Sequence, residues 1–361
     1  MRVRAVDVRV DSRWDAFVER HPDGLVYHHS HWLHALEREN GGPLLALACE
    51  SADGSLLGVL PLLATRGLPL VRGALTARRL ASLPRTPIAG PLAADREVAA
   101  ALVHEAAAYA EGAGMQLQLK VDGRRLDGLM PGLVGTPWRE NYVLGLPAEQ
   151  HQLRFGDARS HNRIKWAIGK AERADVAVRT ADGEDDLRAW YALYLETMRD
   201  HVVPPRPYRF FRALWELMKP AGLFELVLAE QRAVHPPRLL AGSIFLMLGG
   251  TVFYAFNGRH RSSLDLRPND LVMWAAINAA VRRGFRRFDL GEVATGQSGL
   301  AKFKQKWGAD VTRLYRYYCP PVAANEAPDA EIHPHRIAAA VWQRLPLRTT
   351  AFAGKIVYHY L

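Results

Sequence analysis

The sequence has few cysteines and no long apolar segment. Its 361 residues include two cysteines, Cys49 and Cys319, which lie far apart in apolar surroundings. A disulfide framework or a cysteine metal site needs more cysteines at closer spacing. No run of about 18 uninterrupted apolar residues occurs, and the first residues lack the apolar core of a signal peptide. We therefore expect a cytoplasmic protein without a membrane-spanning segment.

The composition is that of a globular protein with a basic surface. Apolar residues make up 49% of the chain and charged residues 23%, and the length is sufficient for two domains. The net charge of +10 favours polyanionic partners, namely tRNA, nucleotide-linked substrates or anionic lipid. An arginine-rich composition with no single partner is equally well supported, because net charge bears on association and not on fold.

Four histidines lie close together near the N-terminus, at His28, His29, His31 and His34. His31 and His34 are one helical turn apart, but no carboxylate or cysteine pattern completes a metal site around them. Ser30 is typical of a helix start. We therefore expect no metal and no resident cofactor.

The same supersecondary unit occurs twice in the chain. Short apolar runs at 44–50 and 56–63 flank an Asp-Gly turn and predict a β-hairpin, and runs at 226–230 and 239–247 repeat the plan. Each hairpin is followed by a predicted helix and a further strand. This repetition predicts a mixed α/β fold of two tandem domains that arose by internal duplication.

The elements that follow the hairpins set the predicted domain boundaries. The helices are expected at 96–111 and 270–283, and the strands at 115–121 and 287–290; Asn269 or Asp270 is expected to cap the second helix. We place the first domain at 1–150, the second at 151–318, and a return segment with a C-terminal tail at 319–361.

The predicted tail is basic and aromatic. It contains a helix at 337–345 that stops at Pro346, and no acidic residue follows Arg336. Two interpretations stay open: contact with an anionic membrane surface, which would make the protein peripheral at the inner face of the membrane, or docking on the protein's own domains.

A basic amphipathic helix is predicted at 160–173, where the second domain begins. Ile164, Ala167, Ile168 and Ala171 form one apolar stripe along it. A later helix at 187–198 runs into the proline-rich segment 200–207, which we expect to form a loop over the site.

A lysine-rich segment follows the strand that ends at Gly291. Its loop contains Gly296 and Gly299, and Lys302, Lys304 and Lys306 come directly afterwards. A glycine-rich turn beside cationic side chains after a buried strand is typical of a site for an anion or an oxyanion.

These segments resemble the FemAB-like family of tandem GNAT-fold aminoacyl and acyl transferases. The resemblance runs from about His28 to about Tyr318. Its motifs are Leu83 to Leu92, Arg163 to Ala171, Glu196 to Arg199, Pro268-Asn269 with Trp274, and Gly299-Leu300 with Phe303-Lys304 and Trp307-Gly308. The resemblance implies two GNAT-like domains and transfer of an acyl group to an amine of a cell-envelope precursor or a secondary metabolite, from aminoacyl-tRNA or from an acyl thioester such as acyl-CoA.

The resemblance also directs attention to individual residues. Lys304 matches the family's Phe-Lys motif and is the first candidate for stabilising an oxyanion or contacting a tRNA phosphate. Lys302 and Lys306 are weaker candidates for substrate binding, because lysines on a short helix often only face solvent. Phe303 and Trp307 are retained as substrate-binding candidates, although packing of the loop is favoured over stacking on adenine.

The general base is less clearly indicated. Asp289 and Glu292 are the catalytic candidates beside Lys304, and Asp289 is equally well explained as a structural hydrogen-bonding residue. Glu292 departs from the family, whose corresponding strand often continues Gly-Arg-Ser. Arg259 and Arg261 are candidates for replacing that arginine.

The predicted basic helix has two interpretations. Arg163 and Lys170 can hold an acceptor diphosphate, for example of a lipid-linked acceptor, or the tRNA backbone. They can equally form a solvated helix face.

Two alternative functions remain. One is an acyl-CoA-dependent GNAT enzyme, although the connection from Arg259 to Asn269 lacks the paired glycines that cradle pyrophosphate in ordinary GNAT enzymes. The other is a non-catalytic RNA- or membrane-binding protein on the same scaffold.

Overall fold

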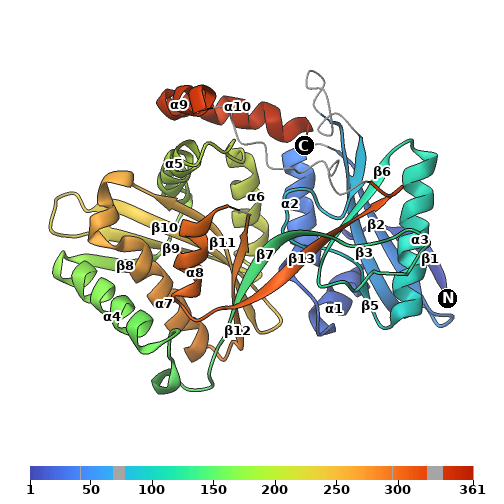
Figure 1. Cartoon of the computed structure of the whole chain (residues 1–361), viewed down its shortest axis with the longest axis horizontal. Helices are drawn as coiled ribbons and strands as arrows, with labels where there is room; N and C mark the ends of the chain where they lie inside the picture. Colours follow the sequence, from blue (N-terminus) through green and yellow to red (C-terminus); the bar gives the residue numbers. More distant parts are fainter. Residues whose placement is uncertain (41, 68–77, 295, 323–335, 361) are drawn as a thin grey trace. The chain divides into compact units, whose positions relative to one another are not determined.

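The computed structural model of the chain describes residues 1–40, 42–67, 78–294, 296–322 and 336–360 (Figure 1). Contacts between residues divide the chain into two compact units. Unit 1 comprises the described residues of Met1–Arg139, Arg313–His333 and Ile356–Leu361, and unit 2 those of Glu140–Thr312 and Pro334–Lys355.

The sheet of unit 1 has the strand order β1-β2-β3-β4-β6-β13, with β5 beside β3. Its strands are β1 Arg2–Val6, β2 Leu44–Glu50, β3 Leu56–Thr65, β4 Arg79–Ala81, β5 Leu92–Ala93, β6 Gln116–Asp122 and the larger part of β13 Asp310–Cys319. Its described helices include α1 Ser12–Arg20, η1 Val26–His28, α2 Ser30–Asn40 and α3 Arg96–Gly112. The side chains of α3 pack on leucines and valines of β2, β3 and β6 and form the apolar core of this unit.

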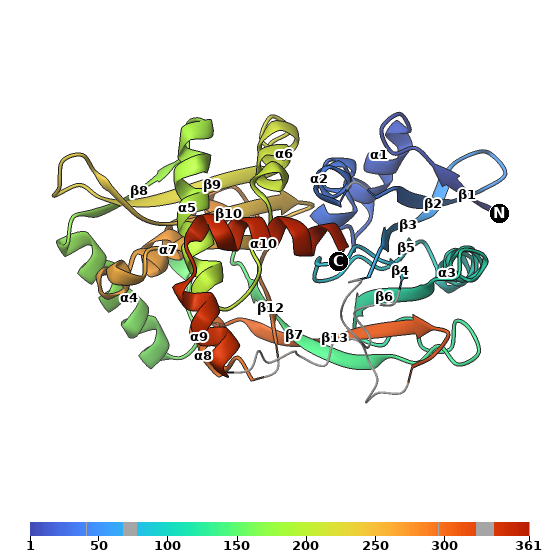
Figure 2. The same cartoon turned by 90° about the horizontal axis from the view of Figure 1, so that it is seen from above.

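The sheet of unit 2 has the strand order β7-β12-β11-β10-β9-β8. Its strands are the larger part of β7 Thr136–Gly145, β8 Val176–Thr180, β9 Phe224–Gln231, β10 Arg238–Leu248, β11 Thr251–Arg259 and β12 Arg287–Val293. Its helices are η3 Gln150–Gln152, α4 Ala158–Arg173, α5 Glu184–Asp200, α6 Tyr208–Met218, η4 Arg261–Leu266, α7 Pro268–Arg282, α8 Ser298–Gln305, α9 Arg336–Arg344 and most of α10 Leu347–Tyr360. Helices α4 and α7 cover one face of the sheet, and α5 and α6 cover the other (Figure 2).

The two units repeat one topology, so the predicted duplication and the mixed α/β fold class are confirmed. In unit 1 the antiparallel strands β1 to β4 lead through α3 to β6, which pairs with β4 in parallel. In unit 2 the antiparallel strands β8 to β11 lead through α7 to β12, which pairs with β11 in parallel. The last strand is exchanged: β7 follows β6 in sequence but pairs with β12, whereas β13 follows β12 and pairs with β6.

The exchange of the last strands explains where the chain passes from one compact unit to the other. The sequence placed the boundary at 150/151, whereas the units change at Arg139/Glu140. Residues from Glu140 onward are hydrogen-bonded to β12, so they belong to the second unit before the first helix of that unit begins. Pairing of Leu314 to Cys319 with β6 likewise returns the chain to the first unit.

The predicted apolar stripe of the basic helix, α4, is confirmed. Its four buried residues are the predicted stripe Ile164, Ala167, Ile168 and Ala171. The expected cap of α7 was wrong. The helix begins at Pro268, so Asn269 and Asp270 lie within its first turn; Arg267 is the N-cap residue, with φ +59°, and no side chain caps the helix.

The histidine cluster is part of the core of unit 1. His28 is buried, its Nε2 lies 2.9 Å from the Gly90 carbonyl oxygen, and burial lowers its pKa to about 4. Helix α2 begins at Ser30, as the sequence indicated. Within the described ranges, no group of three or more histidine, cysteine or acidic residues is arranged to hold a metal ion.

The C-terminal helices pack against α5 and the loop that follows it. Gln343 Nε2 donates to the Asp200 carbonyl oxygen over 3.0 Å, and Arg199 Nη1 donates to that of Leu345 over 3.2 Å. A Cβ at Gly354 would lie 2.2 Å from the Pro205 carbonyl oxygen, so only glycine permits this approach. Of the helices described, none is long and apolar enough to cross a membrane.

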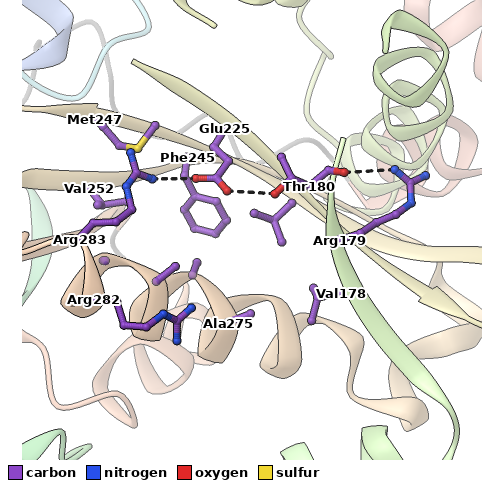
Figure 3. A pocket seen from close by; sticks show the side chains of 14 residues that line it. Val178, Arg179, Thr180, Glu225, Phe245, Met247, Val252, Ala275, Arg282 and Arg283 are labelled. Atoms are coloured by element: carbon purple, nitrogen blue, oxygen red, sulfur yellow. Dashed lines mark hydrogen bonds and ion pairs between the residues drawn. The ribbon is translucent and has the colours of Figure 1, made fainter. Parts of the chain in front are cut away.

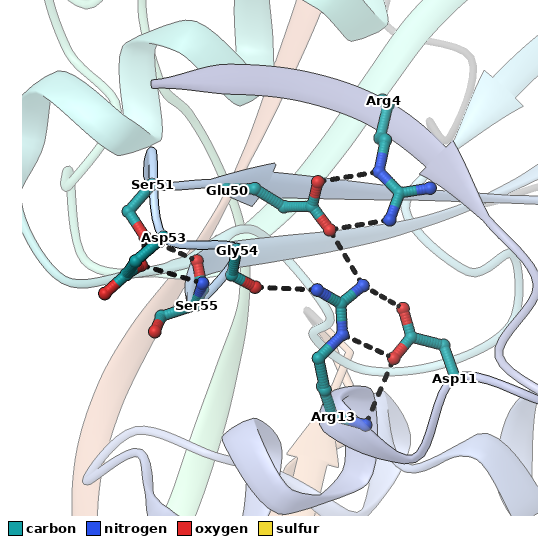
Figure 4. A network of polar contacts seen from close by, with 8 residues as sticks. All are labelled: Arg4, Asp11, Arg13, Glu50, Ser51, Asp53, Gly54 and Ser55. Carbon is teal, nitrogen blue, oxygen red and sulfur yellow. Dashed lines mark hydrogen bonds and ion pairs between the residues drawn. The ribbon is translucent and has the colours of Figure 1, made fainter.

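A network of charged side chains joins β1, α1 and the hairpin β2–β3 in unit 1 (Figure 4). The Glu50 carboxylate accepts two hydrogen bonds of 2.7 Å from Arg4 and one of 2.8 Å from Arg13. Arg13 also donates to Asp11 and to the Gly54 carbonyl oxygen. Hydrogen bonds from Arg4 and Arg13 lower the pKa of Glu50 from its ordinary value of 4.5 to about 2.

We predict that Glu50→Gln lowers the melting temperature at pH 7 by about 2–4 °C. A carboxyl whose folded-state pKa is lowered stabilises the fold above its unfolded-state pKa. The difference in free energy of unfolding between the two proteins should therefore be constant above pH 5 and shrink as the pH falls from 4.5 toward 2. Urea unfolding of both proteins across this pH range measures that difference. Glu105→Gln, at an exposed site on α3, is the control, and an equal effect of both changes would contradict the prediction.

Candidate functional site

The candidate site lies where β11 and β12 stop pairing. The two parallel strands share only the register pairs Thr251↔Arg287, Val252↔Phe288 and Phe253↔Asp289. On its other side β12 continues along β7, with a register shift between Asp289 and Gly291. Beyond Asp289, the polar backbone groups of β12 that face β11 therefore need partners from outside the sheet.

Lys304 supplies one of these partners. It projects from α8, is only 3% exposed, and its Nζ donates a hydrogen bond of 2.9 Å to the Glu292 carbonyl oxygen. Gly291 has φ +80°, and a Cβ there would lie 3.6 Å from Lys304 Nζ and 3.7 Å from the Tyr254 carbonyl oxygen. These are ordinary contact distances, so the positive φ at the bend of the strand is what favours glycine here.

Asp289 lies at the last parallel pair and is held from two sides. One carboxylate oxygen accepts from the Gly291 N–H over 2.7 Å, and the other accepts from Asn141 Nδ2 over 3.1 Å. Burial raises the pKa of this carboxyl above its ordinary range, while the two hydrogen bonds and the Lys304 charge oppose the rise. The arrangement places a proton acceptor of increased basicity beside a buried ammonium group.

Strand β7 completes the polar cluster. The fully buried Tyr142 donates to Glu140 over 2.9 Å, and its ring lies 5.9 Å from Lys304 Nζ. Asp289, Glu292 and Lys304, the three predicted catalytic residues, thus lie together, and Asn141 and Tyr142 join them.

Lys306 follows the last residue of α8, and its side chain reaches the first turn of α7. Its Nζ forms a short ion pair with Asp270 and lies 4.3 Å from the Phe303 ring centroid and 5.4 Å from that of Trp307. Trp307 is fully buried, with its ring edge-on to Phe155 at 5.0 Å. Phe303 packs against the same core. In this structure both aromatic residues fix α8 against the domain.

The remaining lysine of α8 differs from its neighbours. Lys302 is exposed, whereas Lys304 is buried two residues later. The two side chains therefore form a matched pair for testing what burial adds to a lysine on this helix.

The outer surface of α4 carries a second basic group. Trp166 is 55% exposed, and Lys170 Nζ and the Arg267 guanidinium each lie 5.5 Å from its ring. Arg163 lies exposed on the same helix. Trp166 and Arg267 were not among the predicted residues, because their proximity depends on how α4 packs beside α7.

Arg259 and Arg261 lie at the end of β11 and beyond it. Both guanidinium groups approach Asp200, at 3.8 and 3.7 Å. The Glu196 carboxylate accepts from the Arg261 N–H over 3.0 Å and lies 3.1 Å from His260 Nδ1. These two arginines thus pair with acidic residues of α5.

We predict that Gly291→Ala lowers the free energy of unfolding by about 1–2 kcal/mol, because an L-residue is strained at positive φ. Gly145→Ala is the matched control, since Gly145 lies on the neighbouring strand β7 with open space around its Cβ position. Urea unfolding of both variants measures the difference. Equal stability of the two variants would show that the bend at Gly291 carries no strain for other residues.

Comparison with known proteins identifies the domain that contains this cluster. Residues 158–305 match the profile of the acetyltransferase (GNAT) domain. The match includes α4, the parallel pair β11 and β12, and Lys304. No curated protein sequence matches the chain.

Solved structures extend the likeness over nearly the whole chain. FemX aligns with 88% of this chain and 97% of its own, at 15% identity and a TM-score of 0.67. The C-terminal domain of a putative lysylphosphatidylglycerol synthetase from Agrobacterium fabrum aligns with 87% of this chain and 92% of its own, at 13% identity and a TM-score of 0.54. L-PGS from Bacillus licheniformis aligns with 88% of this chain and 96% of its own, at 12% identity and a TM-score of 0.54. The chain therefore shares the fold of FemX, and the resemblance to the FemAB-like family is confirmed at the level of fold.

Proposed function

We propose that the protein is an N-acyltransferase that moves an aminoacyl or other acyl group from an activated ester to an amine and so forms an amide. The observation that carries this proposal is the buried ammonium group of Lys304 at the divergence of β11 and β12. A fixed positive charge in a site with little water stabilises an oxyanion more than the same charge does in solution.

The reaction follows from the groups at this place. The amine nitrogen attacks the acyl carbonyl carbon, and the carbonyl oxygen becomes an oxyanion that the Lys304 ammonium stabilises. When the tetrahedral intermediate collapses, the carbon–nitrogen bond remains and the ester carbon–oxygen bond breaks. The leaving hydroxyl takes up one proton, and the amine has lost one.

Asp289 is our proposed proton acceptor for the amine. Its raised pKa makes the carboxylate a stronger base than an exposed aspartate, and Asn141 and the Gly291 N–H fix its orientation. The charge of Lys304 opposes the effect of burial on the pKa of this carboxyl.

The start of α7 favours aminoacyl-tRNA over acyl-CoA as donor. A GNAT enzyme that uses acyl-CoA binds pyrophosphate at the N-terminus of the corresponding helix. Here Pro268 has no N–H to offer, and Asp270 places a carboxylate in the first turn. Lys306 is paired with this carboxylate, so the charge of that lysine is already compensated.

The surface of α4 supports the same donor. An exposed indole between two cations suits a nucleotide, whose base stacks on the ring while its phosphates meet Lys170 and Arg267. Arg163 on the same helix and the net charge of +10 add to the attraction for RNA.

We predict that Lys304→Met lowers the rate of amide formation about 100-fold or more, the effect of losing one electrostatic stabiliser. Lys302→Met, an exposed lysine two residues earlier on α8, is the control and should retain activity within a factor of about two. The assay incubates the protein with charged tRNAs, acyl-CoAs and candidate amines, and mass spectrometry detects the amide.

The outcomes separate the candidate functions. Turnover with acyl-CoA and none with charged tRNA would contradict the choice of donor. Absence of turnover with every donor, together with RNA binding that both lysine variants retain, would favour the non-catalytic alternative. Equal loss of activity in both variants would assign the effect to surface charge.

The acceptor is proposed to be an amine on an anionic, lipid-linked molecule. The tail supports this proposal. On α10, Phe352 is 64% exposed and lies between the exposed Arg348 and Lys355 at helical spacing. No acidic residue follows Arg336. An apolar side chain flanked by cations suits the surface of an anionic bilayer.

We predict that Phe352→Ser weakens binding to vesicles that contain phosphatidylglycerol by about three-fold or more, while vesicles of phosphatidylcholine bind neither protein. Val10→Ser removes a similarly exposed apolar side chain from unit 1 and should leave binding unchanged. A point variant is preferable to removal of the tail, because Gly354 and the buried Thr350 pack against the domain. Sedimentation measures the bound fraction, and equal binding by all three proteins would contradict the prediction.

A further inference from the structure

A pocket of unit 2 lies under the C-terminal half of α7, and neither Lys304 nor Asp289 is among its lining residues. It is a pocket of about 270 Å³ between this helix and strands β8 to β11 (Figure 3). The pocket is slightly smaller than the range for small-molecule sites, roughly 300–1,000 Å³.

The amino-acid sequence of α7 explains the space. The helix lines the pocket with the short side chains of Ala275, Ala276, Ala279 and Ala280. The opposite wall comes from residues on one face of the sheet, since Glu225 pairs with Phe245 and Met247 with Val252 in the register. A slot with apolar walls results.

Charged side chains stand at the rim of this slot. The Glu225 carboxylate is engaged by Arg283 at 3.0 Å and by the Thr180 hydroxyl at 3.2 Å. Arg179 is engaged by Asp186 at 2.6 and 2.7 Å and by Glu230 at 2.8 Å. The charges of these groups therefore largely compensate one another.

Arg282 differs from the other charged groups of the pocket. It is exposed, lines the pocket, and forms no ion pair with any residue in the described part of the chain. Counting the lining residues alone, three arginines oppose one glutamate. A ligand that fits must accordingly bring an apolar body for the slot and a negative charge for Arg282.

We propose that this pocket is a binding site for a small carboxylate with an aliphatic or aromatic body. The apolar part lies between the α7 alanines and the side chains of Phe245 and Met247, and the carboxylate accepts hydrogen bonds from Arg282. The site is independent of the proposed acyl transfer, because it shares no lining residue with the Lys304 cluster.

Ligand-observed NMR with hexanoate, hexan-1-ol and hexylamine tests the proposal on the full chain. Hexanoate should bind saturably and at least ten-fold more tightly than the alcohol, and the amine should bind most weakly. Arg282→Gln should weaken the binding of hexanoate about ten-fold, the effect of losing one charge-assisted hydrogen bond. Arg286→Gln, an exposed neighbour outside the pocket, is the matched control and should bind as the unchanged protein does.

A second pair of variants tests the location. Ala279→Leu fills the slot and should reduce hexanoate binding at least ten-fold; Ala275→Val is the milder form if the leucine variant does not fold. Absence of hexanoate binding, equal binding of acid and alcohol, or binding that persists in the filled variants would each overturn the proposal.

Discussion

The short parallel pairing of β11 and β12 is the constraint on which the candidate site depends. After three register pairs the strands separate, and the bend at Gly291 turns β12 away from β11 while it continues along β7. A backbone carbonyl that leaves a ladder needs another donor. Lys304 provides it from α8, so the divergence of two strands determines where an ammonium group is buried.

Burying that ammonium group is costly unless it is hydrogen-bonded and compensated by charge. The Glu292 carbonyl oxygen and the nearby Asp289 carboxylate supply this compensation. The same groups then hold the charge in place before any substrate arrives. Preorganisation of this kind is what distinguishes a stabiliser of an oxyanion from an ordinary surface lysine such as Lys302.

The sequence allowed the Lys304 cluster to be predicted only in part. Asp289, Glu292 and Lys304 belong to one strand, loop and helix, so their proximity follows from local order. Asn141 and Tyr142 come from β7, which pairs with β12 only because the last strands of the two halves are exchanged. No local pattern indicates such an exchange.

Two other predictions from the sequence differ from the structure, each for a local physical reason. The sequence ended the tail helix at Pro346 and gave no helix beyond it, yet α10 begins at the next residue. Proline ends one helix and favours the start of another, and only the first property was used. Asn269 or Asp270 was expected to cap α7, but the helix begins at Pro268 and includes both residues in its first turn.

Unit 1 shows how the same topology is used without such a site. There β4 and β6 also pair in parallel over three residues, ending at Ala81↔Gln118. Two positions beyond the last pair stands Lys120, whereas the equivalent position in β12 is Gly291. Lys120 Nζ donates to the carbonyl oxygens of Leu83 and Thr86 over 2.8 and 2.6 Å, so it ties the chain after β4 across the divergence.

The two copies thus meet one backbone requirement in opposite ways. In unit 1 the lysine belongs to the strand and its ammonium group is bound by the loop after β4. In unit 2 glycine takes the strand position, and the lysine comes from a helix that follows. Only the second solution brings a lysine together with the buried Asp289 carboxyl, and that combination is the one suited to acyl transfer.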